Sequence, residues 1–258
     1  MNSRRKRKRS SKRAEKDPKT QTSLEAFRTF LGNKGSDIIL RHTRRLFRTL
    51  PKRKTAGGFK SFFLSAGDKI KKGASAQEKF LVELFLRFSE IDSSLETLKA
   101  LPVYLKHFPN TKRFVKAGIT ERMHMVYQIE HYLQEVYLLK CRMRRFLVFL
   151  GRELRKRGQP RVYESLVQSL QLFEDRLEGI LLARGAHVHQ RRYTDPSLYT
   201  LSLFDLVKAN HQDVQVGYEL LLFAEKARWL KWMQETNQLI VCMVDTIFSA
   251  VNEYVLEE

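Results

Sequence analysis

Residues 163–192 have the sequence YESLVQSLQLFEDRLEGILLARGAHVHQRR, which begins with the most regular helical pattern in the chain. The large apolar residues alternate at spacings of three and four and therefore share one side of a helix: Tyr163, Leu166, Leu170, Phe173, Leu177 and Ile180. Arg184 occupies the next position on that side, so a cation continues a row of core residues. The glycine after it weakens the helix, and Asp195 followed by proline is typical of the start of another. The pattern predicts that His189 lies in a short turn between two helices.

The same helical spacing of apolar residues recurs in the rest of the chain, and no segment shows the period of two that half-buried strands require. The rows are found in residues 80–100, 119–157, 196–210 and 213–254. Gly151 is expected to bend or end the second of these helices. The Gly-Gln-Pro sequence at 158–160 predicts a tight turn between antiparallel helices. We therefore predict an all-α protein, an elongated bundle with a four-helix core.

Composition divides the chain into three predicted parts: a disordered basic arm at residues 1–20, a basic helical extension at 21–73, and the helical bundle at 74–258. In the extension, apolar residues predict two short helices, which the glycines at 32–35 separate. The second of these helices carries a basic stripe at spacings of three or four: Arg41, Arg44, Arg45 and Arg48. Such a helix can contact a nucleic acid or an anionic membrane surface.

The chain has 48 Lys and Arg against 28 Asp and Glu, a formal charge of +20, and most of the excess lies near its beginning. Residues 1–19 hold ten Lys and Arg against two acids, and residues 41–72 hold eleven against one. The densest run is Arg4, Arg5, Lys6, Arg7, Lys8 and Arg9. This arm has no aromatic residue and no aliphatic run to bury, so we expect it to be disordered when free. It is predicted to bind phosphate groups or to act as a nuclear address in a eukaryote; a solvated tail is the alternative.

Several classes of function lack their sequence signals. The chain has no run of about 18 apolar residues, which a membrane span would require. The basic arm is also not followed by the apolar stretch of a secretory signal. Glu121 and His124 have the Glu-x-x-His spacing of di-metal bundles, but the second copy that such a site needs is missing. Cys141 and Cys242 have no partner spacing and indicate a reducing compartment. We expect no metal and no cofactor, and a location in the cytoplasm, or the nucleus in a eukaryote.

An arginine and a histidine separated by four residues, at the end of a bundle helix, resemble the signature of the HEPN superfamily; here they are Arg184 and His189. The resemblance implies a helical bundle that forms a homodimer and, in many members, a metal-independent ribonuclease. His189 would then be the acid or base acting on the ribose 2′-hydroxyl, and Arg184 would stabilise the phosphate charge. His187 competes for this role, because a continuous helix through residue 185 would place it nearer Arg184.

Arg191 and Arg192 are candidates for holding the flanking phosphates, although exposed turn residues are more often only solvated. Together these features predict an RNA-binding protein that cleaves RNA at a site shared by two protomers. The alternative is a non-catalytic scaffold or regulator that binds nucleic acid through its arm and a protein partner through its bundle. A third interpretation, an adaptor at anionic membranes, depends on the same arm.

Overall fold

The computed structural model describes residues 21–48, 75–109, 111–182, 195–208 and 212–255. In these residues it contains helices and turns and no strand, which confirms the all-α prediction. The helices, in chain order, are α1 (Ser23–Arg48), α3 (Ala76–Lys106), α4 (Lys112–Lys116), α5 (Glu121–Lys156), α6 (Pro160–Arg176), α8 (Pro196–Val207) and α9 (Gln212–Val255). No helix among them is both long and apolar enough to cross a membrane.

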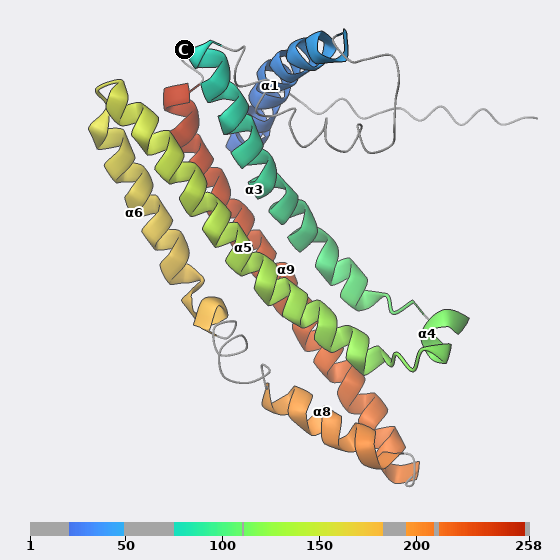
Figure 1. Cartoon of the computed structure of the whole chain (residues 1–258). Helices are drawn as coiled ribbons and strands as arrows, with labels where there is room; N and C mark the ends of the chain where they lie inside the picture. Colours follow the sequence, from blue (N-terminus) through green and yellow to red (C-terminus); the bar gives the residue numbers. More distant parts are fainter. Residues whose placement is uncertain (1–20, 49–74, 110, 183–194, 209–211, 256–258) are drawn as a thin grey trace, which may run out of the picture.

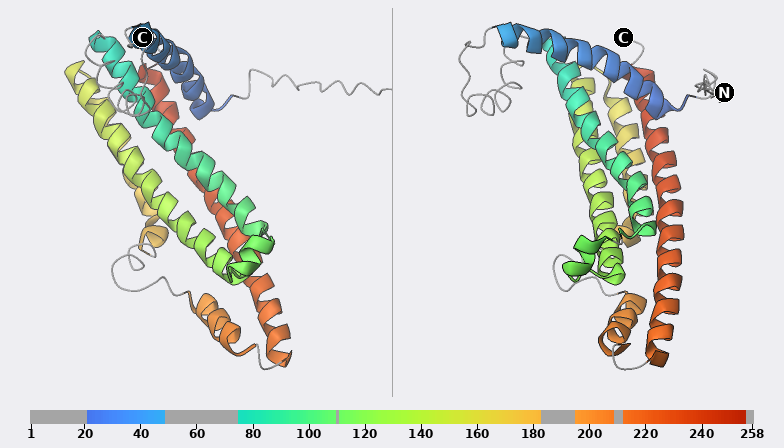
Figure 2. Two further views of the ribbon diagram at one scale, coloured as in Figure 1. Left: turned by 45° about the vertical axis from the view of Figure 1, so that its right-hand side comes forward. Right: turned by 90° about the vertical axis from the view of Figure 1, so that its right-hand side faces the viewer.

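Three long helices, α3, α5 and α9, lie side by side and form the body of an elongated bundle (Figure 1). The shorter α6 packs on α5 and α9 along one half of the bundle, and α8 packs on α9 near its other end. At the end where α5 turns into α6, α1 crosses over α3 and α9 (Figure 2). We call this the α5–α6 end. One continuous core of apolar side chains includes residues from α1, α3, α5, α6, α8 and α9.

The helix ends follow local sequence signals. Ser75 caps α3 in a capping box with Glu78, and the Thr120 side chain accepts a hydrogen bond from the first turn of α5. Asp195 accepts hydrogen bonds from two backbone amides of α8, as its place before a proline predicted. Gly158 closes the α5–α6 turn with a φ of 78°, a conformation that other residues rarely adopt.

The prediction of two short helices in the N-terminal extension was wrong, because α1 is one helix from Ser23 to Arg48. Its Gly35 does not interrupt the helix but allows a close approach to α3. A Cβ atom at this position would lie 2.8 Å from Cδ2 of Phe85. Phe27 of α1 is fully buried and contacts the rings of Phe88, Phe146 and Phe248, with centroids 5.1, 6.1 and 4.8 Å away. The described part of the predicted extension, residues 21–48, therefore packs on the bundle core for most of its length.

Gly151 does not end its helix, since α5 continues past it to Lys156. The glycine is buried against Tyr163 of α6, and a Cβ atom there would lie only 1.9 Å from Cδ2 of that ring. The absence of a side chain at Gly151 allows α5 and α6 to pack close together. This packing outweighs the low helix propensity of glycine.

Candidate functional site

The Arg/His motif lies outside the described residues. This applies to Arg184, His187, His189, Arg191 and Arg192, as it does to the arm residues Arg4, Arg5, Lys6, Arg7, Lys8 and Arg9. The chain is described up to Leu182 on one side of the motif and from Asp195 on the other. The row of apolar residues before it is not one unbroken helix: α6 ends at Arg176, Leu177 forms a turn, and residues 178–182 are helical again.

A cavity of about 490 Å³ lies between the end of α6 and the start of α8, where neither helix covers the body of the bundle. Its lining comes from α5, from the chain around residues 176–180, from Asp195 and from α9: Leu133, Arg176, Gly179, Ile180, Asp195, Arg228, Trp229, Trp232, Thr236 and Leu239. Ile180 and Asp195 stand on opposite sides of the motif in the sequence. Both flanks of the motif therefore border the same cavity.

The two arginines of this cavity differ in their surroundings. Arg228 Nη2 donates to Asp195 Oδ2 at 2.9 Å, and its Nε donates to Glu225 Oε2 at 2.8 Å. Burial disfavours the charge of Arg228, but the bonds to Asp195 and Glu225 outweigh it and raise the pKa of the guanidinium. Arg176 is exposed and has no hydrogen bond or ion pair with any described residue. Arg228 is thus neutralised by its partners, whereas Arg176 offers a charge at the cavity rim.

Aromatic side chains form the α9 wall of the cavity. The rings of Trp229 and Trp232 meet edge to face with centroids 5.2 Å apart, and Trp232 contacts Tyr132 in the same way at 5.6 Å. The Tyr132 hydroxyl donates to Asn237 Oδ1 at 2.8 Å. Burial raises the pKa of Tyr132, so its phenol stays neutral at physiological pH and supports the wall without acting as a base.

A second basic feature lies at the α5–α6 end, in a part of the chain that the prediction of nucleic-acid-binding residues left out. Residues 140–161 contain nine Lys and Arg and a single acid, Glu153. Seven of these cations are exposed: Arg144, Arg145, Arg152, Arg155, Lys156, Arg157 and Arg161. We call these seven residues the basic end. In the sequence, the basic end is identified by the local density of Lys and Arg on one helix and the turn after it. The larger excess of positive charge near the N-terminus concealed this signal.

Some cations of the basic end are engaged within the bundle. Arg144 pairs with Glu174 at 2.8 Å and Lys156 with Glu153 at 2.7 Å. The Arg155 guanidinium lies over the Tyr163 ring, 4.2 Å from its centroid, which leaves its N–H edges available to an anion. Arg152 and Arg161 have no carboxylate partner among the described residues. The basic end therefore carries positive charge that the described bundle does not neutralise.

The described part of the N-terminal quarter, residues 21–48, packs at this same end. The start of α1 is held beside the C-terminal part of α9, where Asn252 donates to the Ser23 carbonyl at 2.8 Å. Farther along α1, the exposed Arg41 pairs with Glu78 of α3 at 3.1 Å. Arg44, Arg45 and Arg48 belong to α1, but their side chains lie outside the described residues. Both ends of α1 and the start of α3 thus lie at the same end of the bundle as the α5–α6 turn (Figure 2).

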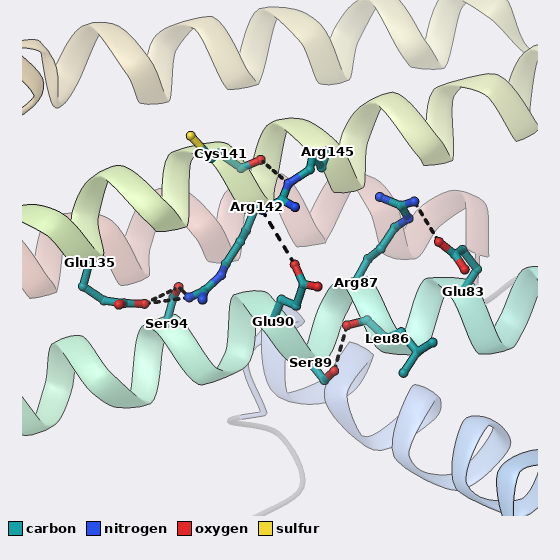
Figure 3. A network of polar contacts seen from close by, with 10 residues as sticks. All are labelled: Glu83, Leu86, Arg87, Ser89, Glu90, Ser94, Glu135, Cys141, Arg142 and Arg145. Atoms are coloured by element: carbon teal, nitrogen blue, oxygen red, sulfur yellow. Dashed lines mark hydrogen bonds and ion pairs between the residues drawn. The ribbon is translucent and has the colours of Figure 1, made fainter. Parts of the chain in front are cut away.

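Buried polar groups between α3 and α5 have a structural role (Figure 3). Glu135 Oε1 accepts hydrogen bonds from the Ser94 hydroxyl and from Arg142 Nη1, both at 2.7 Å. Arg142 Nη1 also donates to Ser94 Oγ. Because Ser94 and Glu135 are buried and bonded to each other, they have no access to a substrate. This cluster fixes the register of α3 against α5 and is not a candidate for catalysis.

The Glu-x-x-His spacing in α5 is also used within the bundle. Glu121 pairs with Lys226 of α9, and His124 Nε2 bonds to the Tyr104 carbonyl oxygen at 2.9 Å. The described part of the chain contains no group of three or more His, Cys, Asp or Glu side chains suited to a metal ion. Cys141 and Cys242 are free thiols.

Comparisons with protein-family models, curated proteins and solved structures gave no match to this chain. The function is therefore argued from the charge and geometry of its own residues.

Proposed function

We propose that this protein binds RNA through the basic end of its helical bundle, together with the basic segments that attach there. The carrying observation is the concentration of seven exposed cations on the last turns of α5, the turn into α6 and the start of α6, with one acid in the same 22 residues. Arginine and lysine at this density neutralise successive phosphates of a nucleic-acid backbone. The resemblance to the HEPN superfamily favours RNA over DNA.

An anionic membrane is the competing partner for this charge, and the distribution of apolar side chains argues against it. A helix that lies in a membrane interface needs an apolar face beside its basic one. Among the described residues, the exposed large apolar side chains nearest the α5–α6 end are Leu40, Leu86 and Val167, which are single residues on three different helices, whereas α8 and the first turns of α9 carry eight such residues. The described basic end has charge without an apolar face to insert.

Charge reversal tests the proposal. The double variant Arg152→Glu and Arg161→Glu should weaken binding to a fluorescent RNA oligonucleotide, measured by anisotropy over a series of salt concentrations. For two lost phosphate contacts, the slope of log affinity against log salt should fall by roughly 1.4 to 1.8. The matched control is Arg113→Glu with Lys116→Glu, which makes the same charge change on exposed residues of α4 at the opposite end.

Deletion of residues 1–19 should lower the same slope further and leave thermal stability nearly unchanged, because the arm has no aromatic residue and no aliphatic run to bury. Equal weakening by the α4 control would show a general charge effect and overturn the assignment to the basic end. Stronger binding to anionic vesicles than to RNA at equal salt would identify a membrane as the partner.

Cleavage of the bound RNA is a second candidate function, and the position of the motif favours it. The described residues on both sides of the motif, Ile180 and Asp195, line the cavity, and a strand leaving the basic end can reach this cavity. His189, or His187 in its place, would take the proton from a 2′-hydroxyl, and Arg184 would stabilise the phosphate. Arg191 and Arg192 would hold neighbouring phosphates. A homodimer would bring two such motifs together.

A further inference from the structure

We infer that the cavity between α6 and α8 binds a single unpaired nucleobase, with the phosphate of the same nucleotide at Arg176. This inference rests on the proposed RNA binding and adds a site of a different kind, one that recognises the base. It uses only described residues. Three observations carry it: the composition of the walls, a cation at the rim, Arg176, that has no partner among the described residues, and the distance from the basic end.

The walls suit a planar aromatic ring. Ile180 and Leu239 supply accessible apolar surface, and the partly exposed indole of Trp232 supplies an aromatic one. Trp229 and Leu133 are buried behind them, and Trp232 is held by its contacts with Trp229 and Tyr132. Unpaired bases are commonly held in proteins by stacking on aromatic side chains. The volume of about 490 Å³ is in the range of small-molecule sites and exceeds what one nucleotide requires. A base in a duplex is stacked and paired, so the cavity selects an unpaired one.

One cation of the described lining is available to a phosphate. Arg228 is bonded to two carboxylates, Asp195 and Glu225, and therefore fixes the start of α8 against α9. Arg176, at the end of α6, is the cation that has no partner among the described residues. A ligand with one aromatic ring and one anionic group would satisfy both the indole wall and this guanidinium.

The same RNA strand can reach both sites. From Pro160 to Arg176, α6 spans 17 residues, about 25 Å at 1.5 Å per residue. A stacked strand advances about 3.4 Å per nucleotide, so about eight nucleotides cover this length. A single-stranded oligonucleotide of 12 nucleotides can therefore contact the basic end and place one base in the cavity.

The chain offers a specific optical reporter, because it has two tryptophans and both line this cavity. Titration with adenosine 5′-monophosphate, under selective tryptophan excitation, should give a saturable change in emission. Adenosine should bind more weakly than the monophosphate, and ribose 5-phosphate should give no change. An equal response to ribose 5-phosphate would show a phosphate site without base recognition and overturn the inference.

Gly179 provides the blocking variant and its control. A Cβ atom added there meets no atom within 4 Å, so a side chain at this position has open space to enter. Gly179→Phe should raise the dissociation constant measured from the emission change at least tenfold. Gly179→Ala should leave this constant unchanged. Both variants should keep the wild-type helical circular dichroism. Arg176→Gln should bind the monophosphate and adenosine equally, because the group that distinguishes them is gone. Wild-type affinity in Gly179→Phe would contradict a base in the cavity.

The oligonucleotide separates this inference from the proposed function. If the 12-mer binds with the expected salt dependence but leaves the emission unchanged, RNA binding stands and the base site is wrong. If the 12-mer does not bind even at low salt while the monophosphate still changes the emission, the cavity is a nucleotide site and the RNA proposal is wrong.

Discussion

The side-chain amide of Asn237 in α9 donates a hydrogen bond to the backbone carbonyl of Leu98 in α3, at 2.7 Å. In a regular helix this carbonyl would accept from the backbone N–H four residues later, but residue 102 is proline and has none. α3 nevertheless continues to Lys106, with Pro102 buried inside it. Asn237 Oδ1 also accepts from the Tyr132 hydroxyl, so one side chain joins α3, α5 and α9.

Replacing this asparagine should reveal how the bundle accommodates the proline. Asn237→Leu leaves the Leu98 carbonyl without its donor and should lower the free energy of unfolding by about 1–3 kcal/mol in urea titrations. Pro102→Ala restores a backbone donor to the same carbonyl. In a double-mutant cycle it should recover part of the loss caused by Asn237→Leu. Strictly additive effects would show that the proline and the asparagine are not coupled.

Asn237 and Gly35 also illustrate what the sequence predicts and what it does not. Helical spacing of apolar residues was sufficient for the all-α bundle, because each helix needs only one buried face. Asn237 lies within the predicted helix of residues 213–254, but its bond to Leu98 depends on which helix packs opposite it. Gly35 looks like a helix breaker in the sequence, and its contact with Phe85 exists only after α1 docks on α3. Propensity is a weak signal where tertiary packing decides.

The candidate site was less predictable than the fold for the same reason. Leu133, Arg176 and Trp229 come from three separate stretches of the chain. They line one cavity because neither α6 nor α8 covers this part of α5 and α9. Periodicity predicted a helix that continued past Leu177, so it gave no sign of this gap in the bundle surface. The Asp195 cap, in contrast, is a local feature and was found in the sequence.

A glycine pair tests the close approach of α5 and α6. Gly151→Ala places a methyl group where the Tyr163 ring now lies and should destabilise the protein by about 1–3 kcal/mol. Gly32→Ala is the matched control, since an added Cβ there meets nothing within 4 Å and α1 gains helix propensity. Thermal unfolding should show a lower Tm for the first variant and an equal or higher Tm for the second. If Gly151→Ala combined with Tyr163→Leu is no more stable than Gly151→Ala alone, the clash is not the cause.

The exposed side of α8 predicts self-association. Its apolar residues follow the spacing of a buried helical face yet lie in solvent: Tyr199, Leu203, Leu206 and Val207. Leu198 and Leu201, on the other side, are buried in the core. We expect a dimer in which two such faces meet, which light scattering should show. The double variant Leu203→Glu and Leu206→Glu should be monomeric. Leu172→Glu, which changes an exposed side chain of α6, should leave the dimer intact. A wild-type monomer at high concentration would also weaken the proposal of a shared catalytic site.

The proposed cleavage is tested by comparing Arg184→Ala, His187→Ala and His189→Ala on single-stranded and structured RNA in EDTA. Wild type should cleave without a divalent metal and leave a 2′,3′-cyclic phosphate, because the attacking group is the neighbouring 2′-hydroxyl. Loss of a general acid or base should slow cleavage by about 10² to 10⁴. His189→Ala should therefore be nearly inactive while it binds RNA with wild-type salt dependence. His187→Ala should retain more activity, and the reverse order would assign the proton transfer to His187. Arg184→Ala should also lose activity, because the growing phosphate charge is no longer stabilised. A wild-type protein that binds RNA but never cleaves it, with both histidine variants unchanged, would leave a non-catalytic scaffold as the function.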